Sequence, residues 1–343
     1  MNNPKVTVLM SVYNGERYLR EAIDSILNQT FTDYEFIIVN DGCTDSSRDI
    51  ITTYSDRRIC LIDNERNIGL TKSLNKGLKK ANGEYIARID ADDISLPQRL
   101  EKQVTFMRKN PKVSVCGGWV IYFGTKKENI IKLPSEANEI KASLFYKNEL
   151  YHTTVIFRRE LQNKEKVFYN EDYLRAQDYE LWSRLSHSSK LRNINEVLAK
   201  YRTHRNTVFK TDEEGQLRDA NRVRITQLKK LIFEPTKDEI KLHLSLLNQE
   251  EIYSLGNIDK IEYWLIKLLK HNDKRKVFNK YLFDNLITKY WFFACNNSTV
   301  NGPEVINVYY SNMKLKGRNI SIINIIKFVI KSLIKYKPVK LIT

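Results

Sequence analysis

The chain has 343 residues, of which 42% are hydrophobic and 29% charged, so it is expected to fold as one large or two modest domains. Its net charge of +16 is expected to lie mostly on a solvated surface, and no nucleic-acid partner is predicted. No run of about 20 apolar residues, signal-peptide pattern or metal-ligand spacing of the cysteines occurs, which argues against a membrane-spanning or secreted protein and predicts a cytoplasmic one.

Strand-like and helical segments alternate through the first third of the chain. Continuous β-favouring runs predict strands that are buried on both faces, at residues 6–12, 34–39, 59–62 and 85–89. Apolar residues at helical spacing predict helices at 19–27, 44–51, 70–78 and 98–107. This alternation predicts an α/β fold with a doubly wound, mainly parallel sheet flanked by helices, in which ligands bind beyond the carboxyl ends of the strands.

The pattern is less regular after residue 118. Further helices are predicted at 135–146 and 179–185, and further strands at 153–157 and 197–201. From about residue 206 onward, leucine, isoleucine and lysine at helical spacing dominate. We therefore predict a catalytic domain at 1–212 and a mostly helical C-terminal region at 213–343.

The end of the chain is strongly basic. Residues 311–343 contain eight Lys or Arg and no acidic residue, which is half of the net charge. Within them, residues 320–336 predict a helix with Asn324, Lys327, Lys331 and Lys335 on one stripe. Two interpretations stay open: a basic amphipathic helix lying on the inner face of the inner membrane, or a helix docked on the catalytic domain.

The acidic run Asp90-Ala91-Asp92-Asp93 directly follows the strand predicted at 85–89. Carboxylates this close repel one another unless a cation lies between them, and a hard divalent ion that also holds phosphate oxygens is the usual solution. Asn14 and Asp41 follow two other predicted strands, so they are expected in the same crevice. The run thus predicts a site for a metal–nucleotide complex, although Asp93 could serve only as a helix cap.

An ordered series of motifs resembles the inverting nucleotide-sugar glycosyltransferases of family 2, which have the GT-A fold. The resemblance covers roughly residues 5–205. Its matching segments are 8–14, 39–45, 67–70, 87–93, 152–155, 177–182 and 201–204. A single DxD motif is weak support, whereas this ordered series is specific.

The resemblance implies a divalent metal site and a UDP-sugar site. Asp90 and Asp92 correspond to the family's DxD pair, which would hold Mn²⁺ or Mg²⁺, and His204 would be a further ligand. Asp41 corresponds to the acid that binds the uracil N–H, although Asn40 and Cys43 replace an acid and a serine that are common beside it. Further nucleotide-sugar contacts are predicted at Asn14, Glu16, Asn67, Arg88 and Ala91. For Asn14 and Glu16 a helix-start role stays equally open, and Arg88 could instead pair with an acidic neighbour.

The resemblance also implies a single catalytic base. Asp178 is the candidate, because one carboxylate suffices to remove the proton of the attacking hydroxyl when a metal stabilises the leaving group. Its rivals are Glu180, Glu171 and Asp172. Candidates for the acceptor side are Trp182, His152 and Gln177; for Trp182 a core position is the stronger alternative.

These residues predict transfer of a sugar, with inversion, from a UDP-sugar to a glycan or lipid-linked glycan of a bacterial surface polysaccharide such as capsule, O-antigen or lipooligosaccharide. One alternative is a nucleotidyltransferase acting on sugar phosphates, but Tyr13-Asn14-Gly15-Glu16 stands where its glycine-rich phosphate loop would be. The other alternative is a non-catalytic protein that binds nucleic acid or membranes through its basic surface.

Overall fold

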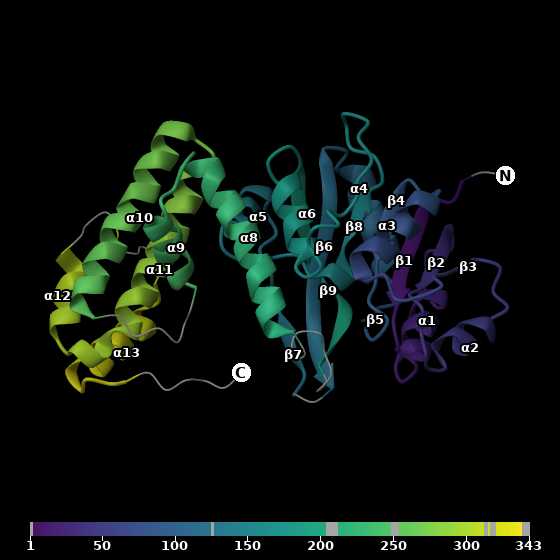
Figure 1. Cartoon of the computed structure of the whole chain (residues 1–343), viewed down its shortest axis with the longest axis horizontal. Helices are drawn as coiled ribbons and strands as arrows, with labels where there is room; N and C mark the ends of the chain where they lie inside the picture. Colours follow the sequence, from purple (N-terminus) through teal and green to yellow (C-terminus); the bar gives the residue numbers. More distant parts are fainter. Residues whose placement is uncertain are drawn as a thin grey trace. The chain divides into compact units, whose positions relative to one another are not determined.

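The computed structural model describes residues 3–124, 127–203, 212–247, 254–311, 315 and 320–337 (Figure 1). The chain divides into two compact units, Met1–Val223 and Arg224–Thr343. After residue 212, every described element of secondary structure is a helix, which confirms the helical C-terminal region. The domain boundary near residue 212 stays a prediction, since helix α8, Glu213–Leu231, runs across the limit between the two units.

The first four strands form the parallel part of the sheet. Their order is β3-β2-β1-β4, with bounds β1 Val6–Val12, β2 Tyr34–Asn40, β3 Ile59–Asp63 and β4 Tyr85–Arg88. Helices α1 Leu19–Leu27, α2 Ser47–Thr52 and α3 Leu70–Lys80 connect them. The register places Val12 beside Asn40 and Asn40 beside Asp63, so the carboxyl ends of β1, β2 and β3 meet at one edge.

The sheet continues from β4 through β8, β6, β9 and β5. The bounds are β5 Ile94–Ser95, β6 Val113–Gly124, β8 Ile156–Arg158 and β9 Lys190–Thr203, and β7 Asn129–Ile131 pairs with β6 alone. β6 and β9 are parallel, whereas β4–β8, β6–β8 and β5–β9 are antiparallel. The α/β class with flanking helices is thus confirmed, and its second half is mixed.

Three predicted elements differ in detail from the structure. The strand predicted at 153–157 is a 3₁₀ turn, His152–Thr154, followed by β8. The strand predicted at 197–201 is the end of the longer β9, and the helix predicted at 135–146 is α5, Ala137–Ser143. The long strand β6 was not predicted.

Both faces of the parallel strands are buried, as their continuous apolar runs predict. Val8 and Met10 of β1 belong to a core cluster with residues of α1 and of α4, Arg99–Lys109. Leu9, on the opposite face, belongs to a second cluster with α3 and with α6, Gln177–Leu185. This two-sided burial fixes the strand ends, and with them the site.

The C-terminal unit is built from helices. They are α9 Lys237–Ser245, α10 Leu255–Arg275, α11 Lys280–Asn297, α12 Glu304–Ser311 and α13 Ile322–Leu333. Trp264, Trp291 and Phe328 are fully buried and form part of its core. Among the described residues, no helix combines the length and the apolar character needed to cross a membrane.

Candidate active site

The acidic run forms a tight turn directly after β4. The Asp93 backbone N–H donates to the carbonyl of Asp90 at 3.3 Å, and the Asp90 N–H donates to Thr153 Oγ1 at 3.5 Å. Arg88, the last residue of β4, is fully buried, and its Nη1 lies 2.5 Å from Asp90 Oδ1 as an ion pair. The Nε and Nη2 atoms of Arg88 make no hydrogen bond to any described residue. Arg88 thus pairs with an acidic neighbour, and its contact with the nucleotide sugar stays a prediction.

This turn concentrates negative charge in a buried place. Burial raises the pKa of Asp90, the charge of Asp92 raises it further, and Arg88 opposes both. Burial raises the pKa of Asp93 well above its usual value, with Asp92 and Asp90 adding to the effect. The Asp93 Oδ2 atom is buried and accepts no hydrogen bond from the described residues. A bound cation would compensate such charge, so the turn has the electrostatics of a cation site.

The donor atoms fit a hard divalent ion. Asp90 and Asp92 keep partly exposed side chains at the turn, whereas Asp93 is buried beneath them. The described residues contain no group of three or more metal-ligating side chains. Mg²⁺ in nucleotide sites, however, commonly takes only one or two carboxylates and completes its shell with water and phosphate oxygens. The predicted ligand His204 lies outside the described residues.

Arg202 of β9 holds the acidic turn from the other side. Its backbone N–H donates to Asp93 Oδ1 at 2.7 Å, and its Nε donates to the Asp92 carbonyl at 2.7 Å. Its Nη2 forms an ion pair with Glu21, and the guanidinium lies 4.3 Å from the centre of the Tyr18 ring. The sequence alone does not reveal this role, because these partners lie far from residue 202 in the chain.

Asp41 organises the loop that leads into α3. Its Oδ1 accepts hydrogen bonds from Ile68 N and Asn64 Nδ2, both at 2.9 Å, and its Oδ2 accepts one from Gly69 N at 3.0 Å. The side chain is 2% exposed. A carboxylate has about four acceptor positions, so one remains for another donor. The predicted contact with uracil would use that position and stays a prediction.

The loops beside Asp41 pack closely. Gly42 has φ +67°, and a Cβ there would come within 2.3 Å of the Arg66 carbonyl carbon, so only glycine fits. Asn67 is exposed, and its Oδ1 accepts a hydrogen bond from Gly69 N at 3.0 Å. Asn67 is therefore at the surface of the same loop, where a nucleotide could reach it.

Asn14 and Glu16 tie the loop after β1 to the loop after β2. Asn14, with φ +50°, accepts a hydrogen bond from Thr44 N through Oδ1 at 2.9 Å. Glu16 accepts one from Ser46 N through Oε2 at 3.0 Å. Neither side chain caps α1, whose N-cap is Tyr18 without a side-chain hydrogen bond. Both side chains are exposed, and their nucleotide contacts stay predictions. A Cβ on Gly15 would lie 3.8 Å from the Ala91 Cβ, which places this loop against the acidic turn.

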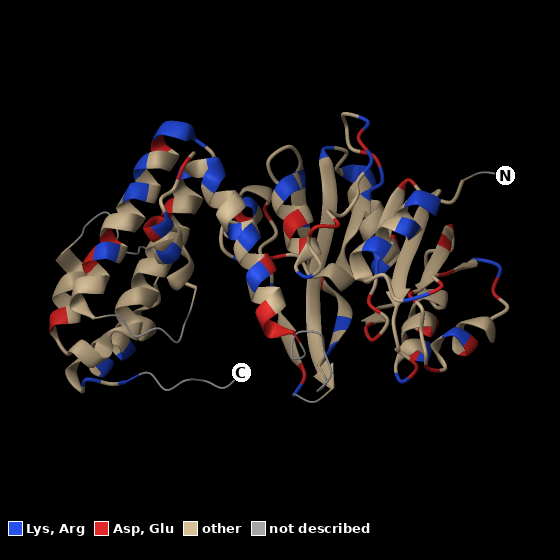
Figure 2. Ribbon diagram, in the orientation of Figure 1, with Lys and Arg blue, Asp and Glu red and all other residues tan. Residues whose placement is uncertain are grey.

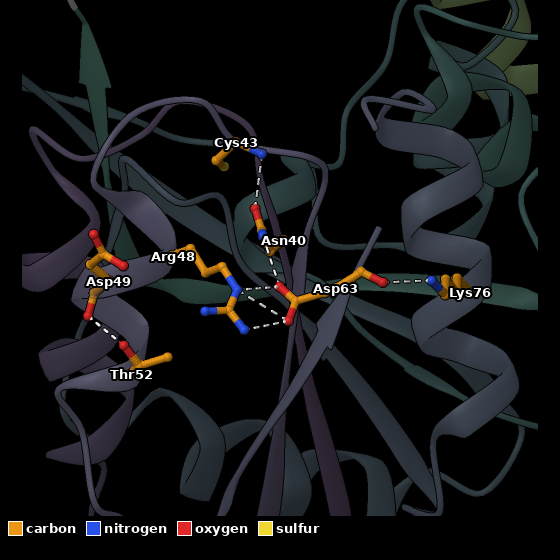
Figure 3. A network of polar contacts seen from close by, with 7 residues as sticks. All are labelled: Asn40, Cys43, Arg48, Asp49, Thr52, Asp63 and Lys76. Atoms are coloured by element: carbon orange, nitrogen blue, oxygen red, sulfur yellow. Dashed lines mark hydrogen bonds and ion pairs between the residues drawn. The ribbon is translucent and has the colours of Figure 1, made fainter. Parts of the chain in front are cut away.

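Asn40 lies in a polar network that explains its replacement of an acid (Figure 3). Its Nδ2 donates to Asp63 Oδ1 at 2.8 Å, and its Oδ1 accepts from Cys43 N at 3.0 Å. Arg48 binds the same carboxylate through Nε and Nη2, and Lys76 Nζ donates to the Asp63 carbonyl at 2.9 Å. An aspartate at position 40 could not donate and would repel Asp63.

Asp178 lies in the first turn of α6. Its Oδ2 accepts a hydrogen bond from Asn148 Nδ2 at 2.8 Å. Burial raises the pKa of Asp178 to about 6, and the charge of Asp90 adds to the effect while Arg88 opposes it. Contacts also link the acidic turn to α6: the Asp90 N–H donates to Thr153, and the ring of the adjacent His152 packs against Trp182 of α6. Asn148 was not predicted, because it follows α5 in a segment without a motif.

The rivals of Asp178 have other partners. Glu180 forms an ion pair with Arg184 at 2.9 Å, and Glu171 Oε1 accepts a hydrogen bond from Asn75 Nδ2 at 2.9 Å. Asp172 is exposed. A general base near neutral pH needs a raised pKa, which burial gives to Asp178, so the arrangement favours Asp178.

The three acceptor-side candidates are placed differently. His152 is partly exposed, its Nε2 lies 2.7 Å from the Tyr169 hydroxyl, and burial and Arg88 hold its pKa well below the usual value, so the ring is neutral. Trp182 is fully buried against the rings of His152 and Phe157, which is the core position, the stronger of its two predicted roles. Gln177 is also buried.

Comparison with known proteins identifies the family. The sequence model described as Glycosyl transferase family 2 matches residues 7–170. An uncharacterized glycosyltransferase of Haemophilus influenzae is 32% identical over 271 residues, which are 76% of this chain and 82% of that protein. The chain belongs to glycosyltransferase family 2. A second relative of this glycosyltransferase, the amylovoran biosynthesis glycosyltransferase AmsE of Erwinia amylovora, is 35% identical over 60% of this chain and 78% of its own length.

Solved structures confirm the GT-A fold of the enzyme. S. aureus TarS 1–349 in complex with UDP superposes with a TM-score of 0.55 at 17% identity, covering 84% of this chain and 90% of that one. The mannosyltransferase PcManGT from Pyrobaculum calidifontis, in complex with GDP-Man and Mn²⁺, gives a TM-score of 0.52 at 15% identity, with coverage of 98% and 87%. At these identities the likeness concerns the fold.

Proposed function

We propose that this glycosyltransferase transfers a sugar from a UDP-sugar to a hydroxyl of a glycan or lipid-linked glycan, with inversion and with the help of Mn²⁺ or Mg²⁺. The observation that carries the proposal is the packing that links the acidic turn to the helix bearing Asp178. The Asp90 N–H donates to Thr153 Oγ1, and the ring of the adjacent His152 lies 6.4 Å from the Trp182 ring of α6. This packing supports a donor-binding carboxylate pair and a base with a pKa raised by burial to about 6 on adjoining segments, as one displacement step requires.

The relatives support the choice of donor and destination. TarS has been crystallised with UDP and with UDP-GlcNAc, and AmsE is named for amylovoran biosynthesis. The acidic turn would hold the metal through Asp90 and Asp92, and a metal bound there stabilises charge on the departing diphosphate. Hence we place this enzyme in the synthesis of a bacterial surface polysaccharide.

The chain's own residues would accept the proton, orient the base and hold the acidic turn in place. Asp178 takes the proton of the acceptor hydroxyl while the hydroxyl oxygen attacks the anomeric carbon from the side opposite the diphosphate, which inverts that carbon. Asn148 orients the carboxylate by its hydrogen bond. Arg202 fixes the acidic turn through Asp93 and the Asp92 carbonyl, so the donor carboxylates keep their positions without rearrangement.

The proposal is tested with two substitutions that separate binding from chemistry. Calorimetry with UDP and Mn²⁺ is expected to detect binding to the wild type and to Asp178→Asn, but at least tenfold weaker binding to Asp92→Asn. Release of UDP from a panel of UDP-sugars, with and without acceptor glycans, is expected to fall at least a hundredfold in Asp178→Asn.

Glu180→Gln is the matched control for the base, because it removes a carboxylate from the same helix turn. It is expected to keep nearly full turnover. The assignment of the base would be wrong if Asp178→Asn and Glu180→Gln lost activity equally. The metal site would be wrong if Asp92→Asn bound UDP with Mn²⁺ as tightly as the wild type.

A further inference from the structure

Helix α13 buries only one of its sides. Phe328 and Ser332 are fully buried. On the other side, six long aliphatic side chains are between 52% and 75% exposed: Ile322, Ile323, Ile326, Ile330, Leu333 and Ile334. We call these six residues the α13 apolar face. Soluble proteins seldom expose this many large aliphatic side chains together unless the patch has a partner.

Helical geometry makes the α13 apolar face continuous. At 3.6 residues per turn, its members fall within an arc roughly 120° wide that points away from Phe328. Lys327 and Lys331 follow one edge of this arc, and Lys335 lies just beyond the end of the helix. The ring of Tyr336, which also follows the helix, lies 5.4 Å from Lys331 Nζ. Aliphatic, basic and aromatic side chains are thus combined as in helices that lie at a lipid–water interface.

The segment that contains this helix carries charge of a single sign. No Asp or Glu occurs between residues 311 and 343, and the ribbon of α13 in Figure 2 accordingly has basic but no acidic residues. Elsewhere in the described chain basic residues often have acidic partners, as in the pairs Lys267–Glu239 and Lys280–Asp273. The α13 apolar face therefore matches a surface that is apolar below and negatively charged above.

We propose that the α13 apolar face docks into the surface of an anionic lipid bilayer, with the helix lying in the plane of the interface. The helix has 12 residues and a length of about 18 Å, which is short of the roughly 30 Å hydrocarbon core, so it lies on the membrane and does not cross it. Each basic residue held near an anionic surface strengthens binding by about fivefold. This inference is independent of the sugar-transfer reaction proposed above.

Flotation with lipid vesicles tests the proposal on the full chain, without nucleotide or metal. The wild type is expected to float with vesicles that contain phosphatidylglycerol. With vesicles of phosphatidylcholine alone it is expected to remain in the bottom fraction. The double substitution Ile326→Ser with Ile330→Ser is expected to weaken flotation at least tenfold. Changing Lys327, Lys331 and Lys335 to Gln is expected to weaken it and to reduce its sensitivity to salt.

The control is Tyr263→Ser, which removes a side chain that is 72% exposed on α10 in the same unit. It is expected to float like the wild type. Since Ile326 and Ile330 are exposed, their substitution is expected to leave the melting temperature unchanged, which separates docking from folding. Equal flotation of the double variant and the wild type would overturn the proposal.

A second copy of the chain is the competing occupant of the α13 apolar face. Sedimentation velocity distinguishes it: a dimer that the double substitution abolishes, together with no flotation of the wild type, would overturn lipid docking in favour of self-association. UDP binding, measured in the same samples, reports the donor site separately. Failure of vesicle binding is thus distinguishable from failure of the proposed reaction.

Discussion

As the proposed base, Asp178 must be ionised to accept a proton, and its raised pKa is expected to set the acid side of the pH profile. With a pKa of about 6, kcat/KM for transfer is expected to fall roughly tenfold per pH unit below pH 6 and to reach a plateau above it. Asn148→Ala removes a hydrogen bond to the charged carboxylate, so the pKa should rise and the acid limb should move to higher pH.

The measurement is kcat/KM as a function of pH for the wild type, Asn148→Ala and Glu180→Gln. Glu180→Gln should leave the acid limb where it is, since Glu180 pairs with Arg184 on another side of the helix. An acid limb that moves to lower pH in Asn148→Ala, or that moves equally in both variants, would contradict the assigned contact.

Asn40 provides a prediction about stability. Asn40→Asp removes the donor to Asp63 and places two carboxylates within hydrogen-bonding distance, so the free energy of unfolding is expected to fall by about 1–3 kcal/mol at neutral pH. The loss should shrink as the pH falls and the carboxyl groups become protonated. Urea unfolding at two pH values measures both effects, and a loss that grows in acid would refute the explanation.

Among the elements, the four parallel strands could be predicted closely and the rest of the sheet only in part, since β8 and the end of β9 were anticipated but β6 was not. β1 to β4 have apolar runs because both their faces are buried, and that burial is visible in the sequence itself. β6 instead contains Gly117 and Gly118, which resemble a break. The structure shows why they are needed: a Cβ on Gly117 would come within 2.4 Å of Asn193 Oδ1, and one on Gly118 within 2.4 Å of Leu198 Cδ1.

The residues of the candidate site likewise fall into those that the sequence reveals and those that it does not. The DxD pair, Asp41 and Asp178 could be recognised because each stands at a motif at the end or start of an element. Asn148 and the role of Arg202 could not, because each acts through a contact between segments that are distant in sequence. Periodicity and spacing report local structure and burial, whereas these contacts depend on how the sheet pairs β9 with β5 and β6.

Arg202 provides a prediction about how β9 supports the acidic turn. Arg202→Lys keeps the charge but loses the planar group that binds the Asp92 carbonyl and Glu21 together, so donor binding is expected to weaken about tenfold. Calorimetry with UDP and Mn²⁺ measures it. Lys200→Gln on the same strand is the control and should bind normally. Equal affinity of Arg202→Lys and the wild type would show that the turn keeps its shape without this contact.

The described residues of the proposed donor site all belong to the first of the two units, since they precede Val223. A ligand that binds only the folded first unit stabilises that unit by mass action, by about 2.7 kcal/mol at a concentration one hundred times its Kd.

UDP with Mn²⁺ is therefore expected to slow hydrogen exchange in β1, β2 and β4 while leaving α10 and α11 unchanged. Hydrogen-exchange mass spectrometry of the full chain measures both regions in one sample, and Asp92→Asn, which should show no protection in either, is the control. Equal protection of both regions would mean that the two units unfold as one cooperative body, because protection of α10 and α11 requires the binding energy to reach helices that do not touch the ligand.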